Sequence, residues 1–193
     1  MTIGKALALA AVVIVVAGPL TAQESVLELD PAQTHVDLTL GATFHTVHGA
    51  FKLKRGTVRI DPATGKASGE VVVDATSGDT GNDSRDSRMH KNILESAKYP
   101  DIVFRPDHFE GKLPAEGSAT LQVHGIFSIH GADHEITIPV QAQMKSDQVS
   151  VTMQFSVPYL KWGMRNPSTF VLRVSDKAEI EIRAAGRILP PRT

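Results

Sequence analysis

The amino-acid sequence predicts an all-β fold, an antiparallel barrel of about eight strands with one short helix at about residues 84–97. Three observations predict it. Apolar and polar residues alternate in many separate runs, turn-forming residues separate these runs at short intervals, and one segment between two runs has helical periodicity instead. Alternation with period two gives each strand one face in an apolar interior and one face in water, which is typical of antiparallel sheets.

The N-terminal segment, residues 1–22, predicts a secretory signal peptide. It has one early cation, Lys5, followed by an apolar run from Ala6 to Ala17 that is too short to span a bilayer comfortably. The alternative is an uncleaved anchor helix. Cleavage would leave one domain, residues 23–189, with a short tail, 190–193, and no integral membrane segment.

The strand pattern continues along the rest of the chain. Alternating runs occupy residues 36–40, 58–60, 71–73, 102–104, 121–129, 136–140, 149–157, 170–174 and 180–184. The segments between them, such as "DPATGKASG", "PAEGS", "HGADH" and "SDQ", are rich in turn residues and short, so neighbouring strands should form antiparallel hairpins. Such strands form either a two-sheet sandwich or a barrel, and only the closed barrel leaves no exposed edge.

The helical segment reads "DSRDSRMHKNILESAKYP". Asp83 can cap its first turn, Lys98 favours its last turn and Pro100 ends it. At about 100° per residue, one stripe of this helix collects five side chains. They are Met89, His90, Ile93, Leu94 and Ala97.

Two polar residues, Asp86 and His90, lie on this apolar stripe, one turn apart. Burying a carboxylate and an imidazole is costly unless each finds a partner, so the pair predicts a polar or water-filled cavity beneath the helix. The alternative is that Asp86 caps its own helix and His90 lies at the edge of the stripe, in solvent.

Charge and composition limit the kinds of partner and the cellular location that we expect. The formal net charge of −1 provides no field to attract nucleic acid, which we do not expect as a partner. The chain contains no cysteine, so an exported protein of this kind would be stabilised by burial and strand pairing alone. We expect it in a bacterial periplasm or secreted. The sequence gives no strong signal for an oligomer.

Enzymatic and metal-binding motifs are scarce. The sequence has no G-x-S-x-G elbow, no H-E-x-x-H pair and no Gly-rich phosphate loop, so we expect neither catalysis nor a cofactor. His45 and His48 have a spacing compatible with a weak metal site. His124 and His130 should point away from the barrel interior, because they have the opposite parity to the apolar residues of their strand.

Several motifs resemble those of the YceI-like, or polyisoprenoid-binding, family. They are "SRD", "AKYPDIVF", "LQVHGIFSIHGADHEITIPV" and "WGM", and the resemblance covers roughly residues 26–188. It implies an extended lipocalin-like barrel whose interior holds a long apolar tail, in exported bacterial proteins. The better-known prenyl-lipid binders resemble R-D-x-H-L-R-S in the helix, whereas this chain reads "RDSRMH". This difference is typical of a variant subgroup and leaves the ligand open among isoprenoids, quinones, fatty acids and amide-bearing amphiphiles.

Two hypotheses for the function follow. In the first, the protein holds a small apolar amphiphile in a hollow barrel, with polar residues at the mouth selecting the head group. In the second, the barrel is filled by its own side chains and acts through its outer surface, in envelope stress or with a redox partner. The small size of many interior residues favours the first. The candidate ligand-binding residues are Leu38, Phe44, Arg85, Asp86, Met89, His90, Ile93, Phe104, Phe127, Met153, Phe155 and Trp162.

Overall fold

The computed structural model describes residues 24–170 and 172–189, so the predicted signal peptide and C-terminal tail lie outside the described residues. The described residues form nine strands in a single antiparallel sheet. The strands are β1 (Ser25–Leu29), β2 (His35–Gly41), β3 (Thr46–Asp61), β4 (Lys66–Asp79), β5 (Asp101–Glu110), β6 (Gly117–Ile129), β7 (Ala132–Lys145), β8 (Gln148–Val157) and β9 (Ala178–Leu189).

The sheet closes on itself, because β3 pairs with both β2 and β4. Strands β1 and β2 share one position in the barrel. At one end β1 lies between β3 and β9, and at the other end β2 takes its place between the same two strands. The predicted eight-stranded antiparallel barrel is therefore confirmed, with one of its strands interrupted.

The interruption between β1 and β2 is a short 3-10 helix, Pro31–Gln33. Proline has no backbone N–H to give to a neighbouring strand, so the ladder stops there. The Asp30 carboxylate accepts a hydrogen bond of 2.9 Å from the backbone N–H of Ala32 and caps the turn.

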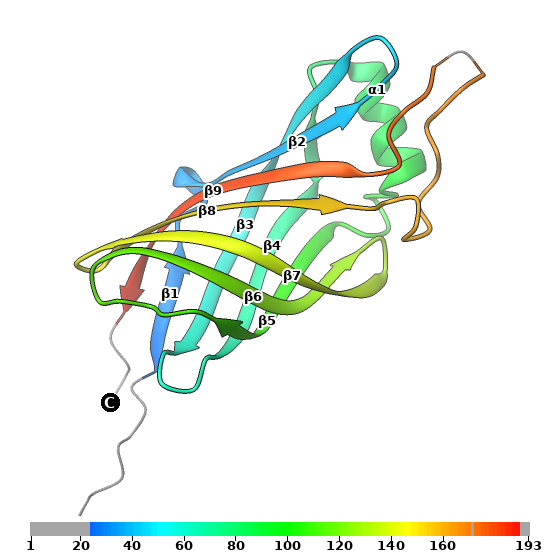
Figure 1. Ribbon diagram of the computed structural model, residues 1–193. Coiled ribbons are helices and arrows are strands. Elements are labelled where there is room, and N and C mark those ends of the chain that lie inside the picture. Colours follow the sequence, from blue (N-terminus) through cyan, green and yellow to red (C-terminus); the bar gives the residue numbers. More distant parts are fainter. Residues whose placement is uncertain (1–23, 171, 190–193) are drawn as a thin grey trace, which may run out of the picture.

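Alternate side chains along the strands point into the barrel and toward solvent, as predicted. In β7, Ile138, Val140, Ala142 and Met144 are buried and the residues between them are exposed. Only 3% of Ile138 and 2% of Met144 remain accessible to solvent. The apolar faces of all strands meet inside the barrel, which is elongated (Figure 1).

The helix lies at one end of the barrel, opposite the end at which β9 finishes (Figure 1). It consists of α1 (Asp83–Arg88) and one π-helical turn, Met89–Ile93. The side chain of Asn82, instead of Asp83, caps the first turn by accepting a hydrogen bond of 3.0 Å from the Arg85 N–H. The predicted end near residue 97 was also wrong, because Glu95 has a φ of 47° and breaks the helical path.

The predicted strand at residues 170–174 was wrong as well. Its described residues lie in the long connection between β8 and β9, where Val174 makes only an isolated bridge with Ala42. Local bonds take the place of a ladder: the Val174 N–H donates to Ser168 Oγ at 3.0 Å, and the Thr169 N–H donates to the Leu172 carbonyl at 2.8 Å. The Ser168 hydroxyl thus accepts from a backbone group that would otherwise join a ladder, as serine and threonine side chains often do.

Candidate functional site

The barrel interior contains two adjacent cavities, of about 510 Å³ and about 160 Å³. The larger lies beneath the helix and the smaller lies toward the β1 end. Several side chains form part of both walls, so the two spaces follow one another along the barrel axis. The shared residues are Val36, Val73, Ile102, Phe127, Phe155 and Ile182.

The smaller cavity has an almost entirely apolar wall, in which Thr34 is the one polar residue among those that the structure describes. Phe104 and Met153, both predicted to contact a ligand, belong to this wall. Phe127 and Phe155 also line it, and their rings meet edge to face with centroids 5.9 Å apart. The Thr34 hydroxyl donates to the Asp30 carbonyl at 2.8 Å, so none of the described polar side chains is free to meet a ligand in this cavity.

The larger cavity combines an apolar body with a polar mouth. Leu38, Met89 and Ile93, all predicted from the sequence, contribute apolar wall. Polar side chains gather where the helix and the loop after β2 meet the cavity. They are His45, Thr80, Ser84, Arg85 and Arg88.

Arg85 is held in a fixed orientation at this mouth. Its Nε donates to Thr80 Oγ1 at 2.7 Å and its Nη2 donates to the Thr80 carbonyl at 2.8 Å. These bonds tie the first helical turn to the end of β4. The guanidinium is thus a positioned cation beside an apolar space, an arrangement that can orient a polar head group.

Asp86 lies outside the cavity walls and holds the Thr80 segment in place. Its Oδ1 accepts hydrogen bonds from the Thr80 N–H, at 3.1 Å, and from the Thr80 hydroxyl. Burial raises the pKa of Asp86, but the hydrogen bonds from Thr80 and Asn82 and the nearby charge of Arg85 outweigh it, so the net pKa is lowered. The carboxylate supports Arg85 and Thr80 from behind.

His90 also lies outside the cavity walls. Its Nε2 is 2.9 Å from the Gly78 carbonyl, which can only accept, so Nε2 donates. Its Nδ1 is 3.0 Å from the hydroxyl of the buried Ser96. Asp86 and His90 therefore find separate partners, and His90 fastens the end of the helix to β4.

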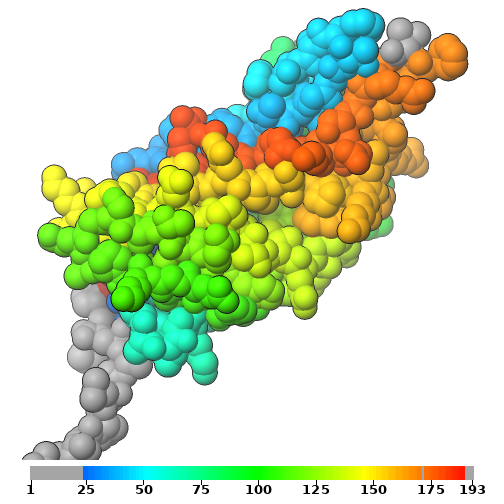
Figure 2. All heavy atoms as spheres, viewed as in Figure 1, coloured from blue at the N-terminus to red at the C-terminus, as the bar shows by residue number. Residues whose placement is uncertain are grey.

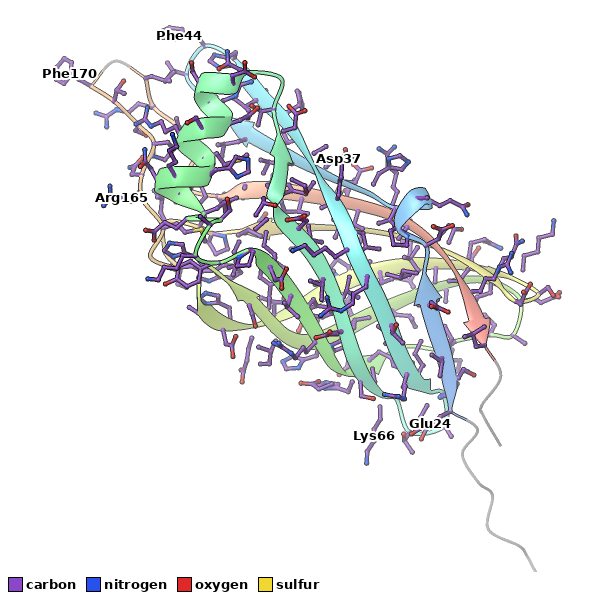
Figure 3. All side chains as sticks on the ribbon, turned by 180° about the vertical axis from the view of Figure 1, so that it is seen from behind. Glu24, Asp37, Phe44, Lys66, Arg165 and Phe170 are labelled. Atoms are coloured by element: carbon purple, nitrogen blue, oxygen red, sulfur yellow. The ribbon has the colours of Figure 1, made fainter. Side chains whose placement is uncertain are left out.

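Two predicted aromatic residues lie away from the cavities. Phe44 is 76% exposed, and Figure 3 shows it projecting outward from the end of the barrel where the helix lies. Trp162 stacks on His134, with ring centroids 4.0 Å apart and planes 6° from parallel, and its ring centroid is 5.7 Å from that of Phe127. Trp162 therefore packs against the wall residue Phe127 without lining either cavity.

Tyr159 is a wall residue that the sequence analysis missed. It is buried in the connection after β8, and its hydroxyl donates to the Ser175 carbonyl at 2.6 Å. Burial, with a smaller contribution from Asp176, raises the pKa of Tyr159 to about 12. Its place directly after an alternating run was the signal that could have found it.

The connection after β8 closes one side of the mouth. The Thr43 N–H donates to the Arg173 carbonyl at 2.9 Å, which joins this connection to the loop between β2 and β3. Figure 2 shows the two segments side by side at this end of the molecule. The larger cavity is thus framed by these two loops and the helix.

Comparison with known proteins assigns this architecture. Residues 27–185 match the YceI-like domain. The chain belongs to the YceI-like family. The family resemblance stated from the sequence motifs is thereby confirmed.

Three solved structures have the YceI-like fold of this chain. BcnA of Burkholderia cenocepacia is 19% identical, with a TM-score of 0.65 over 81% of this chain and 98% of its own. A polyisoprenoid binding domain from Saccharophagus degradans is 18% identical, with a TM-score of 0.67 over 86% and 98%. The YceI protein of Campylobacter jejuni is 16% identical, with a TM-score of 0.52 over 79% and 85%. At these identities the likeness shows the fold alone.

Two further findings complete the comparison. The search of proteins with curated function gave no match to this chain. Within residues 24–170 and 172–189, none of the helices has the length and apolar character needed to cross a membrane.

Proposed function

We propose that this YceI-like protein binds a small apolar amphiphile, with its tail in the two cavities and its head group near Arg85 and Arg88. The proposal rests on the polarity of the interior. Among the described residues, the wall is mainly apolar along the barrel, and polar side chains gather where the helix and the loop after β2 meet the larger cavity. A barrel filled by its own side chains would have no such space. The polyisoprenoid-binding domain named among the similar structures is consistent with this proposal.

Burial of the tail provides the affinity. Removing apolar surface from water contributes about 25 cal/mol per Å², so a tail burying about 400 Å² gains on the order of 10 kcal/mol before immobilisation is subtracted. This contribution discriminates poorly between isoprenoid, quinone and fatty-acid tails. Selection then rests on the head group, where two guanidinium groups favour a carboxylate, a phosphate or a polarised carbonyl.

We further propose that the protein acts after export, in a periplasm or outside the cell, as a binding protein and not as an enzyme. The sequence features of residues 1–22 support export. The positioned groups at the mouth are cations, a hydroxyl held by Asp86 and a histidine, an arrangement suited to binding a head group.

A cavity-filling substitution tests the proposal. Val73 is buried in the wall shared by both cavities, so Val73→Phe should occupy the path of a tail. We expect palmitate, decylubiquinone or farnesol to raise the Tm of the unsubstituted protein, because a ligand at about 100 times its Kd stabilises the folded state by about 2.7 kcal/mol. Differential scanning fluorimetry measures the shift, which Val73→Phe should abolish.

The control is Ser150→Phe, which places the same side chain on the exposed face of β8. It should leave the ligand-dependent shift unchanged. If Val73→Phe and Ser150→Phe respond to the amphiphiles alike, the barrel interior is not the binding site.

A further inference from the structure

Outside the cavities, three potential metal ligands meet on the outer face of β5 and β6. They are Asp107, His108 and His124. The Asp107 carboxylate bonds to Nδ1 of His108 and lies 2.9 Å from Nδ1 of His124. The two imidazole rings stack with centroids 4.7 Å apart. None of the three lines either cavity.

A bulge in β5 brings these groups to one face. Consecutive strand residues normally point to opposite faces, but the register between β5 and β6 shifts between Pro106, opposite Gly125, and His108, opposite His124. Asp107 is the extra residue, and Asp107 and His108 are both exposed between the buried Pro106 and Phe109. Bulges of this kind re-aim side chains and are over-represented next to functional sites.

Gly125 permits the close approach that the bulge requires. A Cβ at this position would lie 2.3 Å from the Arg105 carbonyl oxygen and 2.8 Å from the Cα of Pro106. The sequence thus combines "PDH" in one strand with "HG" in the next. The extra residue Asp107 forms the bulge, and Gly125, which has no side chain, leaves room for it.

The atoms have the spacing and chemistry of a metal site. One ligand atom from each residue can be chosen so that all three lie within 4.8 Å of one another. In a tetrahedral site with bonds of about 2.0–2.1 Å, ligand atoms lie about 3.3–3.5 Å apart, so small side-chain rotations suffice to admit an ion. Two imidazoles and a carboxylate suit Zn²⁺ and Cu²⁺, with water completing the coordination.

We propose that Asp107, His108 and His124 form a surface binding site for a divalent transition-metal ion of the Zn²⁺ and Cu²⁺ class. The site is independent of the proposed amphiphile site and faces the opposite side of the barrel wall. It is also distinct from the His45 and His48 pair suggested by sequence spacing. Within the described part of the chain, that pair belongs to no cluster of three ligands.

The competing explanation is a hydrogen-bonded clasp in which Asp107 joins β5 to β6 without any ion. Both explanations predict that substitutions here alter local packing. Only the metal site predicts saturable binding of one ion, so the test must measure the ion directly.

Isothermal titration of the tag-free protein with ZnCl₂ at neutral pH tests the proposal. We expect one equivalent of Zn²⁺ to bind with a Kd of about 10 μM or tighter, which is about −7 kcal/mol. His108→Ala and Asp107→Asn should each weaken binding at least about tenfold, because each removes one of three ligands. The folded state of each variant is checked by circular dichroism before titration.

The matched control is the double variant His45→Ala and His48→Ala, which removes two exposed histidines elsewhere and should retain the site. Absence of saturable binding up to about 100 μM free Zn²⁺ overturns the proposal. So does one-equivalent binding that survives His108→Ala or is lost in the double variant. Addition of farnesol or palmitate should leave the Zn²⁺ titration unchanged. The metal site and the amphiphile site can therefore be confirmed or rejected independently.

Discussion

At the scale of single residues, the polar side chains on the helix act mainly on the protein itself. Asp86 binds Thr80 and Thr80 binds Arg85, and of these three Arg85 and Thr80 line the larger cavity. His90 connects the helix to the Gly78 carbonyl and to Ser96. The sequence predicted that Asp86 and His90 would form a pair beneath the helix. Instead, each residue separately fastens the helix to the end of β4, outside the cavity walls.

His90→Ala tests this assignment. The substitution leaves the buried Gly78 carbonyl and Ser96 hydroxyl without their partner, so we expect a loss of about 1–3 kcal/mol in the free energy of unfolding. Urea denaturation measures it, with Lys91→Ala on the exposed side of the helix as the control. Unchanged stability combined with altered head-group preference would assign His90 to the binding site instead.

We expect His134 to make the stability of the folded protein depend on pH. Burial against Trp162 lowers the pKa of His134 below its usual value of 6.5, and the nearby Asp133 only partly offsets this effect. The unfolded chain therefore binds a proton at a higher pH than the folded protein does. Neutral His134 therefore contributes to the stability of the folded state in full above pH 6.5, and this contribution is lost as the pH falls through the lowered pKa.

His134→Phe keeps a flat ring beside Trp162 and removes the titrating group. We expect the Tm of the unsubstituted protein to fall more steeply than that of the variant between pH 7 and the mildly acidic range. Thermal melts followed by tryptophan fluorescence across this range provide the comparison. Parallel Tm profiles for the two proteins would show that His134 contributes nothing to the pH dependence.

At the scale of elements, close backbone approaches decide the local geometry of the strands. Gly125→Ala would place a Cβ 2.3 Å from the Arg105 carbonyl oxygen. We expect this substitution to cost about 1–3 kcal/mol, the usual cost of overpacking, and to disturb the bulge at Asp107. At Gly41 an added Cβ meets only the Cβ of Ser175, at 3.9 Å, so Gly41→Ala is the control and should be nearly neutral.

Chemical denaturation gives the stability of both glycine variants, and the His124 imidazole signals in NMR spectra report the bulge. Equal stabilities for Gly125→Ala and Gly41→Ala would mean that β5 and β6 can separate at the bulge without cost.

The sequence predicted the strands well because alternation follows directly from which face of a strand is buried. Val73, Phe127 and Phe155 point inward as their parity requires. The same pattern failed at residues 170–174, where serine and threonine side chains capture the backbone. It also could not show the bulge at Asp107, because a one-residue register shift reverses the parity that the prediction relies on.

Part of the candidate site could be predicted, because helical periodicity also shows which face of an element is buried. Helical periodicity correctly placed Met89 and Ile93 toward the barrel. It could not show that the helix ends in a π-turn or that His90 turns toward the Gly78 carbonyl, since both depend on where β4 lies. Thr80 lies outside the periodic segments and joins the wall only through tertiary packing, whereas Tyr159 lies just beyond the end of an alternating run.

At the scale of the whole molecule, the closed sheet leaves a long apolar space that its own side chains do not fill. The strands fix the width of this space, while the helix and the two loops at one end provide its polar mouth. The surface cluster at Asp107 lies on the outside of the same wall, so the two proposed sites differ in chemistry and lie on opposite faces of the barrel wall.

Native mass spectrometry of the protein purified from its native organism, without added lipid, shows whether an apolar amphiphile occupies the barrel. We predict a folded species that carries the mass of one apolar amphiphile, releases it on denaturation into organic solvent, and lacks it in Val73→Phe. Detection of the bare protein mass alone, together with no rise in Tm on addition of any amphiphile, would mean that the barrel does not hold such a ligand.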